Sequence, residues 1–348
     1  MKKSLIALAV LAASGAAMAQ SSVTLFGIVD TGVGYVKNSG GADNYGLANS
    51  GLATSRLGFR GVEDLGGGLK AGFWLEGGLT PDDGTAGGFN FKRRSTISLM
   101  GNFGEVRLGR ELVAGYKTSN YDLFGQVGMG QFLGWNNSLY GTAGDADGVR
   151  ANNLIGYYTP NIGGFNAALQ YGFGESAASN QNNRYIGANV GYDNGPLSVT
   201  LAADQNNFAF GAAPVVSLDR TQVSLGASYD FGMAKLAGLV QRVEFEPAAG
   251  GTKVRVNNWS LGVSAPVGPG TVKAQYASYD EKNSSDDAQQ ISLGYQYDLS
   301  KRTAVYTTVA FLKNKNNSNV ALGGAGLGLA ADAGKNQTGF QVGVRHAF

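Results

Sequence analysis

The chain has 348 residues, with 27 lysines and arginines, 25 aspartates and glutamates, and a formal net charge of +2. This near balance excludes the basic surface of a nucleic-acid-binding protein, and the absence of cysteine excludes a disulfide framework or a thiolate metal site. With 55 glycines, only 7 prolines and a mean hydropathy of −0.10, the composition indicates neither a disordered chain nor a collagen-like one.

The first residues have the pattern of a signal peptide. Two lysines follow Met1, and an apolar run from Leu5 to Ala19 ends in the small-x-small sequence Ala17-Met18-Ala19. The run is shorter than the ~20 residues of a membrane-spanning helix, which makes an uncleaved anchor the less favoured alternative. We therefore predict a signal peptide over residues 1–19 and an exported barrel over residues 20–348. Without the two lysines of residues 1–19, 25 basic and 25 acidic side chains remain.

From residue 22 onward, apolar and polar residues alternate with period 2. In residues 22–36 one face carries Val23, Leu25 and Val29, and the other includes Asp30. The same pattern recurs in residues 197–204, 221–229, 257–265, 289–297 and 338–348. Alternation alone would also fit a soluble barrel, but the second face is mostly Ser, Thr, Gln and Gly, which is too small and polar to fill a packed interior. The pattern favours a membrane barrel that is apolar outside and polar inside.

The connections between the predicted strands are alternately short turns and long polar stretches. Turn sequences occur at residues 63–66, 101–104, 160–163, 193–196, 231–233, 267–270 and 299–302. Seven hairpins, a first strand at 22–36 and a last strand at 338–348 give sixteen strands, and an even number lets the two ends pair and close the barrel. The predicted long loops include residues 37–51 and 312–337.

Tyrosines on the predicted apolar face stand just before short turns, where amphipathic rings suit a membrane–water boundary. They are Tyr157, Tyr192, Tyr229, Tyr295 and Tyr297. The longest irregular stretch, residues 111–148, contains six glycines from Gly125 to Gly144 and lies between the predicted fifth and sixth strands. A loop of this length is usually functional or disordered, and we predict that it folds into the lumen and narrows it. An external loop is the alternative.

Five segments resemble the trimeric general porins of Gram-negative bacteria, in their beta-proteobacterial branch. They are residues 22–30 (SVTLFGIVD), 55–71 (SRLGFRGVEDLGGGLKA), 101–110 (GNFGEVRLGR), 297–303 (YDLSKRT) and 342–348 (VGVRHAF). The resemblance implies an all-β, 16-stranded antiparallel transmembrane β-barrel with a long third loop in the lumen. It also implies a homotrimer in the cell outer membrane. Expected partners are outer-membrane lipid, lipopolysaccharide, the barrel assembly machinery, and small hydrophilic solutes and anions.

The same family has a column of arginines on the barrel wall opposite the inward loop, and the matching positions are Arg56, Arg94 and Arg150. Alternation also turns Arg60 toward the lumen, since its neighbour Phe59 is on the apolar face. Guanidinium groups stay charged and offer several donors, so stacked arginines could guide anions. Alternatively, they could pair with loop carboxylates as a structural clamp. The segment 120–125 is similar to the family's loop tip, which makes Asp122 the candidate facing acid.

The predicted function is a water-filled channel for passive diffusion of small hydrophilic solutes and ions, weakly selective for anions. No catalytic residue is predicted, because the only histidine, His346, lies on the lipid-facing side two residues from the end. No metal or cofactor site is predicted either. A barrel acting as an adhesin is a further alternative, which conductance would distinguish. The terminal Phe348 resembles the C-terminal assembly signal of outer-membrane barrels.

Overall fold

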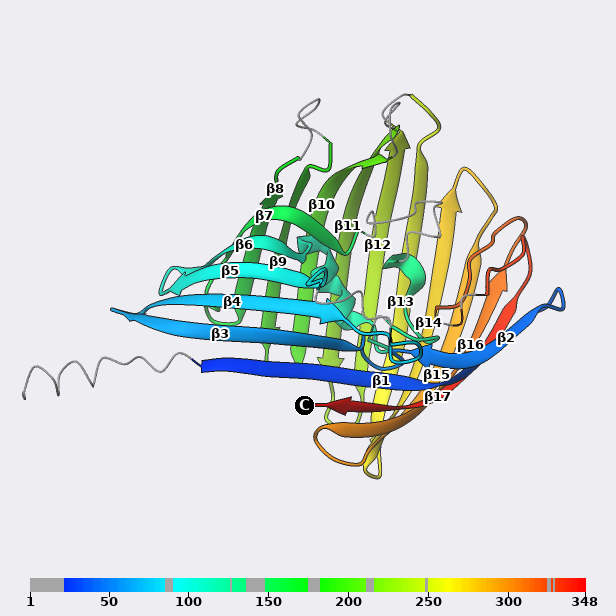
Figure 1. The fold of residues 1–348 in the computed structure, drawn as a ribbon. Coiled ribbons are helices and arrows are strands. Elements are labelled where there is room, and N and C mark those ends of the chain that lie inside the picture. Colours follow the sequence, from blue (N-terminus) through cyan, green and yellow to red (C-terminus); the bar gives the residue numbers. More distant parts are fainter. Residues whose placement is uncertain are drawn as a thin grey trace, which may run out of the picture.

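A computed structural model describes residues 22–84, 90–125, 127–135, 148–174, 182–210, 216–247, 250–323, 327 and 329–348. The predicted signal peptide lies outside the described residues, as does the segment 136–147 of the predicted inward loop. The fold is an antiparallel barrel built from seventeen strand segments (Figure 1).

The strands are β1 (Ser22–Asn38), β2 (Asp43–Asn49), β3 (Arg56–Gly66), β4 (Leu69–Gly78), β5 (Arg94–Gly101), β6 (Gly104–Leu112), β7 (Arg150–Tyr158), β8 (Phe165–Gly172), β9 (Tyr185–Asn194), β10 (Leu197–Phe210), β11 (Val216–Asp230), β12 (Lys235–Pro247), β13 (Val254–Val267), β14 (Gly270–Lys282), β15 (Ala288–Asp298), β16 (Thr303–Asn314) and β17 (Gln337–Ala347). Every strand pairs antiparallel with its neighbours.

The first and last strands close the barrel. Residues 28–38 of β1 pair with residues 337–347 of β17, and Figure 1 shows the two strands side by side. The other edge of β1 pairs with β2 along residues 31–37 and with β3 along residues 22–28. β2 and β3 therefore share one position around the barrel, which confirms the predicted 16-stranded architecture.

The sequence prediction of a loop over residues 37–51 was wrong. β1 continues to Asn38, a tight turn follows, and β2 returns along β1 from Asp43 to Asn49. Glycines and polar residues obscured the alternation there. The chain leaves the sheet only at residues 50–55, where the backbone N–H groups of Gly51, Leu52 and Ala53 all bond to the carboxylate of Asp30.

The two faces of the wall have the reverse of a soluble protein's polarity. On β13, Trp259, Leu261 and Val263 are 42–51% exposed, whereas Asn258 and Ser260 are 2% and 4% exposed. Large apolar side chains on the outer face of nearly every strand are exposed in the same way. A band of apolar side chains without protein cover needs lipid around it, and it excludes the interpretation of the alternation as a soluble barrel.

All seven predicted short turns join consecutive strands at one end of the barrel. The five tyrosines predicted beside them lie next to these turns, and Tyr157, Tyr229 and Tyr297 are about 40% exposed on the outer face. Gly163, Gly195, Gly232 and Gly268 have φ between +55 and +82° in these turns, which is where a residue without Cβ is required. The opposite end carries the long loops.

The long loop between β6 and β7 enters the barrel, as predicted. Its first part contains two short 3₁₀ helices, η1 (Ala114–Tyr121) and η2 (Leu133–Trp135). The Tyr121 hydroxyl lies 2.9 Å from Ser198 Oγ and Thr200 Oγ1, and Leu133 N donates to the Tyr279 hydroxyl. The loop thus spans the lumen from β10 to β14. In the described residues no helix is long and apolar enough to cross a bilayer.

A second long loop covers the first from inside the barrel. Val320, Leu322 and Leu327, between β16 and β17, are buried in one apolar cluster with Met129 and Leu133 of the inward loop. The Gln337 side chain accepts from Leu322 N and donates to Leu329 O, which fixes this loop against the wall. The two loops therefore fill the side of the lumen along β10–β17.

We predict that Leu225→Arg lowers the free energy of unfolding by about 2–4 kcal/mol, because the side chain lies in lipid near the middle of β11. Unfolding in lipid bilayers by urea would measure it, with the inward, half-buried Gln296→Arg as the control that should cost far less. The inward neighbour Ser224 is no such control, since it is 1% exposed and contacts Thr118 of η1. Equal losses at positions 225 and 296 would contradict the assignment of faces.

Candidate functional site

The charged part of the lumen wall lies on β3–β6. Pairing places Arg60 opposite Trp74, and Trp74 opposite Thr96, so these side chains share the inner face. One step toward the long loops, Glu76 stands opposite Arg94. Alternation therefore brings the inward residues of four consecutive strands into one patch, as the sequence predicted for Arg56, Arg60 and Arg94.

Glu76 links two arginines. Its Oε1 lies 2.7 Å from Arg93 Nε and 3.6 Å from Arg56 Nη1, and its Oε2 accepts from Trp74 Nε1 at 3.1 Å. Arg93 precedes β5 and was not predicted as a wall residue. Arg93 lies just before β5, so strand alternation does not turn it outward, and both it and Arg94 reach carboxylates of the inner wall.

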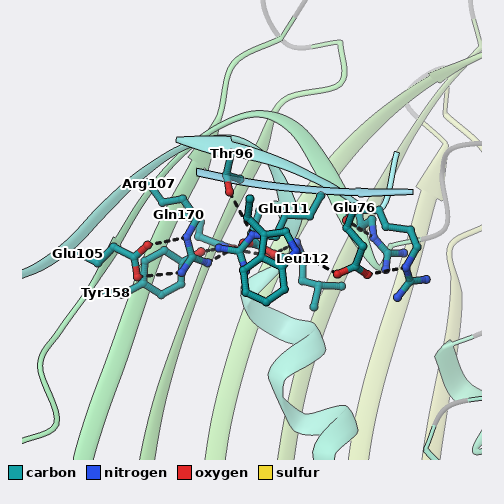
Figure 2. Close-up of polar contacts among 12 residues, drawn as sticks. Glu76, Thr96, Glu105, Arg107, Glu111, Leu112, Tyr158 and Gln170 are labelled. Atoms are coloured by element: carbon teal, nitrogen blue, oxygen red, sulfur yellow. Dashed lines mark hydrogen bonds and ion pairs between the residues drawn. The ribbon is translucent and has the colours of Figure 1, made fainter. Parts of the chain in front are cut away.

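Glu111 and Glu105 hold two further arginines of the wall, Arg94 and Arg107. Arg94 Nε lies 2.9 Å from Glu111 Oε2, and Arg107 lies between the two acids, 2.6 Å from Glu111 and 2.9 Å from Glu105, as Figure 2 shows. The Arg107 guanidinium also covers the Tyr158 ring at 4.2 Å. These contacts fix the arginine planes along the wall, and the clamping acids come from the wall itself.

A bulge interrupts the alternation where Arg150 lies. Gly109 pairs with Leu154 but Glu111 pairs with Ala151, so two residues of β7 face one of β6, and Asn153 there has φ of +51°. Arg150 consequently stands opposite Leu112, and its Nε donates to the Arg93 carbonyl at 2.7 Å. Strand alternation therefore does not carry across the bulge to Arg150.

Arg60 differs from the other wall arginines in its partners. Its guanidinium lies 5.3 Å from the Phe26 ring centroid and 5.1 Å from that of Trp74, and no carboxylate lies within 4.0 Å among the residues that the structure describes. Arg94 lies 4.4 Å from the same Trp74 ring. Cation–π contacts position a guanidinium without neutralising it.

Asp122 acts on the loop that contains it. One carboxylate oxygen accepts from Phe124 N and from Gln275 Nε2, and the other accepts from Phe132 N, at 3.0–3.1 Å. The side chain is 5% exposed. It thereby ties two stretches of the inward loop to β14, a role that fits a structural clamp.

A buried ion pair holds both ends of the inward loop and was not predicted. Arg220 and Asp204 lie 3.3 Å apart on β11 and β10, with side chains 2% and 0% exposed. A Cβ at Gly115 would lie 1.6 Å from Asp204, and one at Gly148 would lie 2.7 Å from Arg220. Only glycine fits at either end. The two residues are 16 positions apart in the sequence, and no motif there predicts that they pair.

The wall can attract ions but has no arrangement for covalent chemistry. Arg56, Arg60, Arg93, Arg94 and Arg107 face Glu76, Glu105 and Glu111, a surplus of two positive charges. His346 is exposed on the outer face and contacts Thr303. Within the described ranges, no three His, Asp or Glu side chains gather as metal ligands.

Comparisons with known proteins agree on one family. The model of the Gram-negative porin family matches residues 5–317. Outer membrane porin protein 32 of Delftia acidovorans is 58% identical, and an outer membrane porin protein of Bordetella pertussis is 34% identical, each over 100% of both chains. The solved anion-selective porin from Comamonas acidovorans has a TM-score of 0.88 and 56% identity, covering 94% of this chain and 100% of that chain.

We predict that Asp122→Asn destabilises the inward loop by about 1–3 kcal/mol, since the amide nitrogen cannot accept the hydrogen bond that one carboxylate oxygen accepts now. The thermal unfolding midpoint should fall, and open-channel current noise should rise. Asp64→Asn is the matched control, because its amide oxygen can still accept from Gly66 N in a short turn. Unchanged noise and midpoint in the first variant would contradict the clamp.

Proposed function

Because the chain belongs to the Gram-negative porin family, we propose that it is an outer-membrane channel for passive diffusion of small hydrophilic solutes, weakly selective for anions. Water fills the lumen of a barrel with this many strands, and the outer apolar band suits the membrane. The observation that carries the selectivity is the surplus of two arginines on the open side of the lumen. Arg56, Arg60, Arg94 and Arg150 are proposed as the basic wall of the constriction, with Asp122 as a loop acid.

The selectivity should be weak because most of the wall charge is paired. A fixed charge acts on a passing ion within about 8 Å at physiological salt, and each glutamate lies well inside that distance of an arginine. A passing anion therefore responds to the unbalanced charge. The similar porin from Comamonas acidovorans is described as anion-selective, which supports the same sign here.

The assembled form is proposed as a homotrimer in outer-membrane lipid and lipopolysaccharide, as in the family that the chain resembles. Residues 1–19 would direct export, and the barrel assembly machinery would insert the chain. The exposed apolar side chains of the outer wall provide surface for both lipid and neighbouring subunits.

Replacing Arg56, Arg94 and Arg150 together with glutamine should abolish anion selectivity. Arg60, Arg93 and Arg107 would then face three glutamates, so the chloride-over-potassium permeability ratio should fall toward unity or below. Reversal potentials in a potassium chloride gradient across a planar bilayer measure this ratio. The outward Lys313→Gln removes a charge from the outer face and should leave the ratio unchanged. A wild-type pore that prefers potassium would refute the proposed selectivity.

Deleting Phe348 should reduce the amount of assembled barrel without reducing export. Phe348 N and O pair with Gly27, and its ring lies against Gly27 on the outer face, so the residue completes the closing seam. The ratio of heat-modifiable to unfolded protein in outer-membrane fractions measures assembly. Phe348→Tyr keeps the aromatic terminus and the backbone pairing, so it should assemble normally, and equal assembly of the deletion variant would refute this role.

A further inference from the structure

The wall contains a niche on the short-turn side of the paired arginines. It has a volume of about 360 Å³, within the range of small-molecule sites. Arg60, Arg94 and Arg107 line it together with the apolar side chains of Val62, Trp74 and Met100. Glu105 also lines it, and its carboxylate is paired with Arg107 at 2.9 Å. All seven belong to β3–β6, the four strands whose inner face forms the charged wall.

The three arginines of the niche differ in how far nearby glutamates neutralise their charge. Arg94 and Arg107 both lie within 3 Å of a glutamate oxygen, whereas Arg60 has two aromatic rings as its neighbours. The rings of Phe26 and Trp74 stack edge to face with centroids 5.0 Å apart, so they form a fixed support behind the guanidinium. Arg60 is exposed, so its donors remain available to the lumen.

The apolar lining restricts which anions fit best. A hydrated inorganic anion gains only from the guanidinium groups, whereas a carboxylate with a flat apolar body also covers Val62, Met100 and the planar Arg60. Weak retention of this kind slows a solute without stopping it.

We propose that this niche is a binding site for small aromatic carboxylates, with Arg60 as the residue that holds the carboxylate group. The inference rests on the proposed function, because the ligand must first enter an open, anion-permeable lumen. Arg56, two inward positions closer to the long loops on β3, carries the same charge but does not line the niche. Replacing Arg56 therefore distinguishes a contact between Arg60 and the ligand from a general effect of charge in the lumen.

The test compares benzoate with acetate as blockers of chloride current through single channels in a planar bilayer. Arg60→Gln should raise the half-blocking concentration of benzoate about ten-fold, while Arg56→Gln, with the same change in charge, should raise it less than about two-fold. Acetate should block both variants and the wild type equally weakly. The reversal potential, measured in the same membranes, should shift to a similar extent in both variants.

Two further variants keep the result interpretable. Val62→Ser and Met100→Ser leave the arginines and the aromatic rings beside them in place, so the reversal potential should hold while benzoate block weakens. Equal loss of block in Arg60→Gln and Arg56→Gln, or equal block by benzoate and acetate, would overturn the niche while leaving the anion-selective channel standing. A wild-type pore without anion preference would instead refute the proposed function.

Discussion

The structure depends on pairing the backbone N–H and C=O groups of its strands with one another, because the surrounding lipid offers no hydrogen-bond partner. A polar backbone group exposed to hydrocarbon costs several kcal/mol, so a sheet in a membrane must have no free edge. The pairing of β1 with β17, extended by the bonds between Gly27 and Phe348, removes that edge. Closure then fixes one face of every strand outward and the other inward. The reversed polarity of the wall follows, because only the outer face meets lipid.

The inner face uses this arrangement to hold charge. Neighbouring strands bring Glu76, Glu105 and Glu111 against the wall arginines, and largely buried ion pairs of this kind add little net stability because desolvation offsets their attraction. Their effect is on placement: each guanidinium has a defined position beside the water path. The side of the lumen that the two loops fill has apolar side chains instead of charged ones. Leu322, Leu327 and Met129 are buried there in one apolar cluster, away from the charged strands β3–β6.

Much of this fold could be predicted from the sequence because period-2 alternation and short turns are local features. Alternation correctly oriented Arg56, Arg60 and Arg94. It did not carry to Arg150, because the bulge opposite Arg110 changes the register of β7 and leaves no mark in composition. The short strand β2 was missed because its alternation is weak.

Contacts between residues that are far apart in the chain could not be predicted, for a different reason. The Arg220–Asp204 pair joins two strands to both ends of the inward loop, and no spacing in the chain encodes such a meeting. Asp122 matched a loop-tip position, yet its observed partners are loop backbone and Gln275, which only the folded loop brings near. The apolar run from Val320 to Ala331 was visible in the sequence, and an apolar run within a loop is a sign of burial.

The placement of the acids on the same wall as the arginines shapes the electric field in the lumen. If acids and bases stood on opposite sides, the field of each pair would cross the pore and turn a dipolar solute as it passed. Here the ion pairs run along β3–β6, and their fields largely cancel a short distance from the wall. The paired charges therefore exert little torque on a zwitterion such as a free amino acid, and the field that reaches across the lumen is that of the surplus positive charge alone.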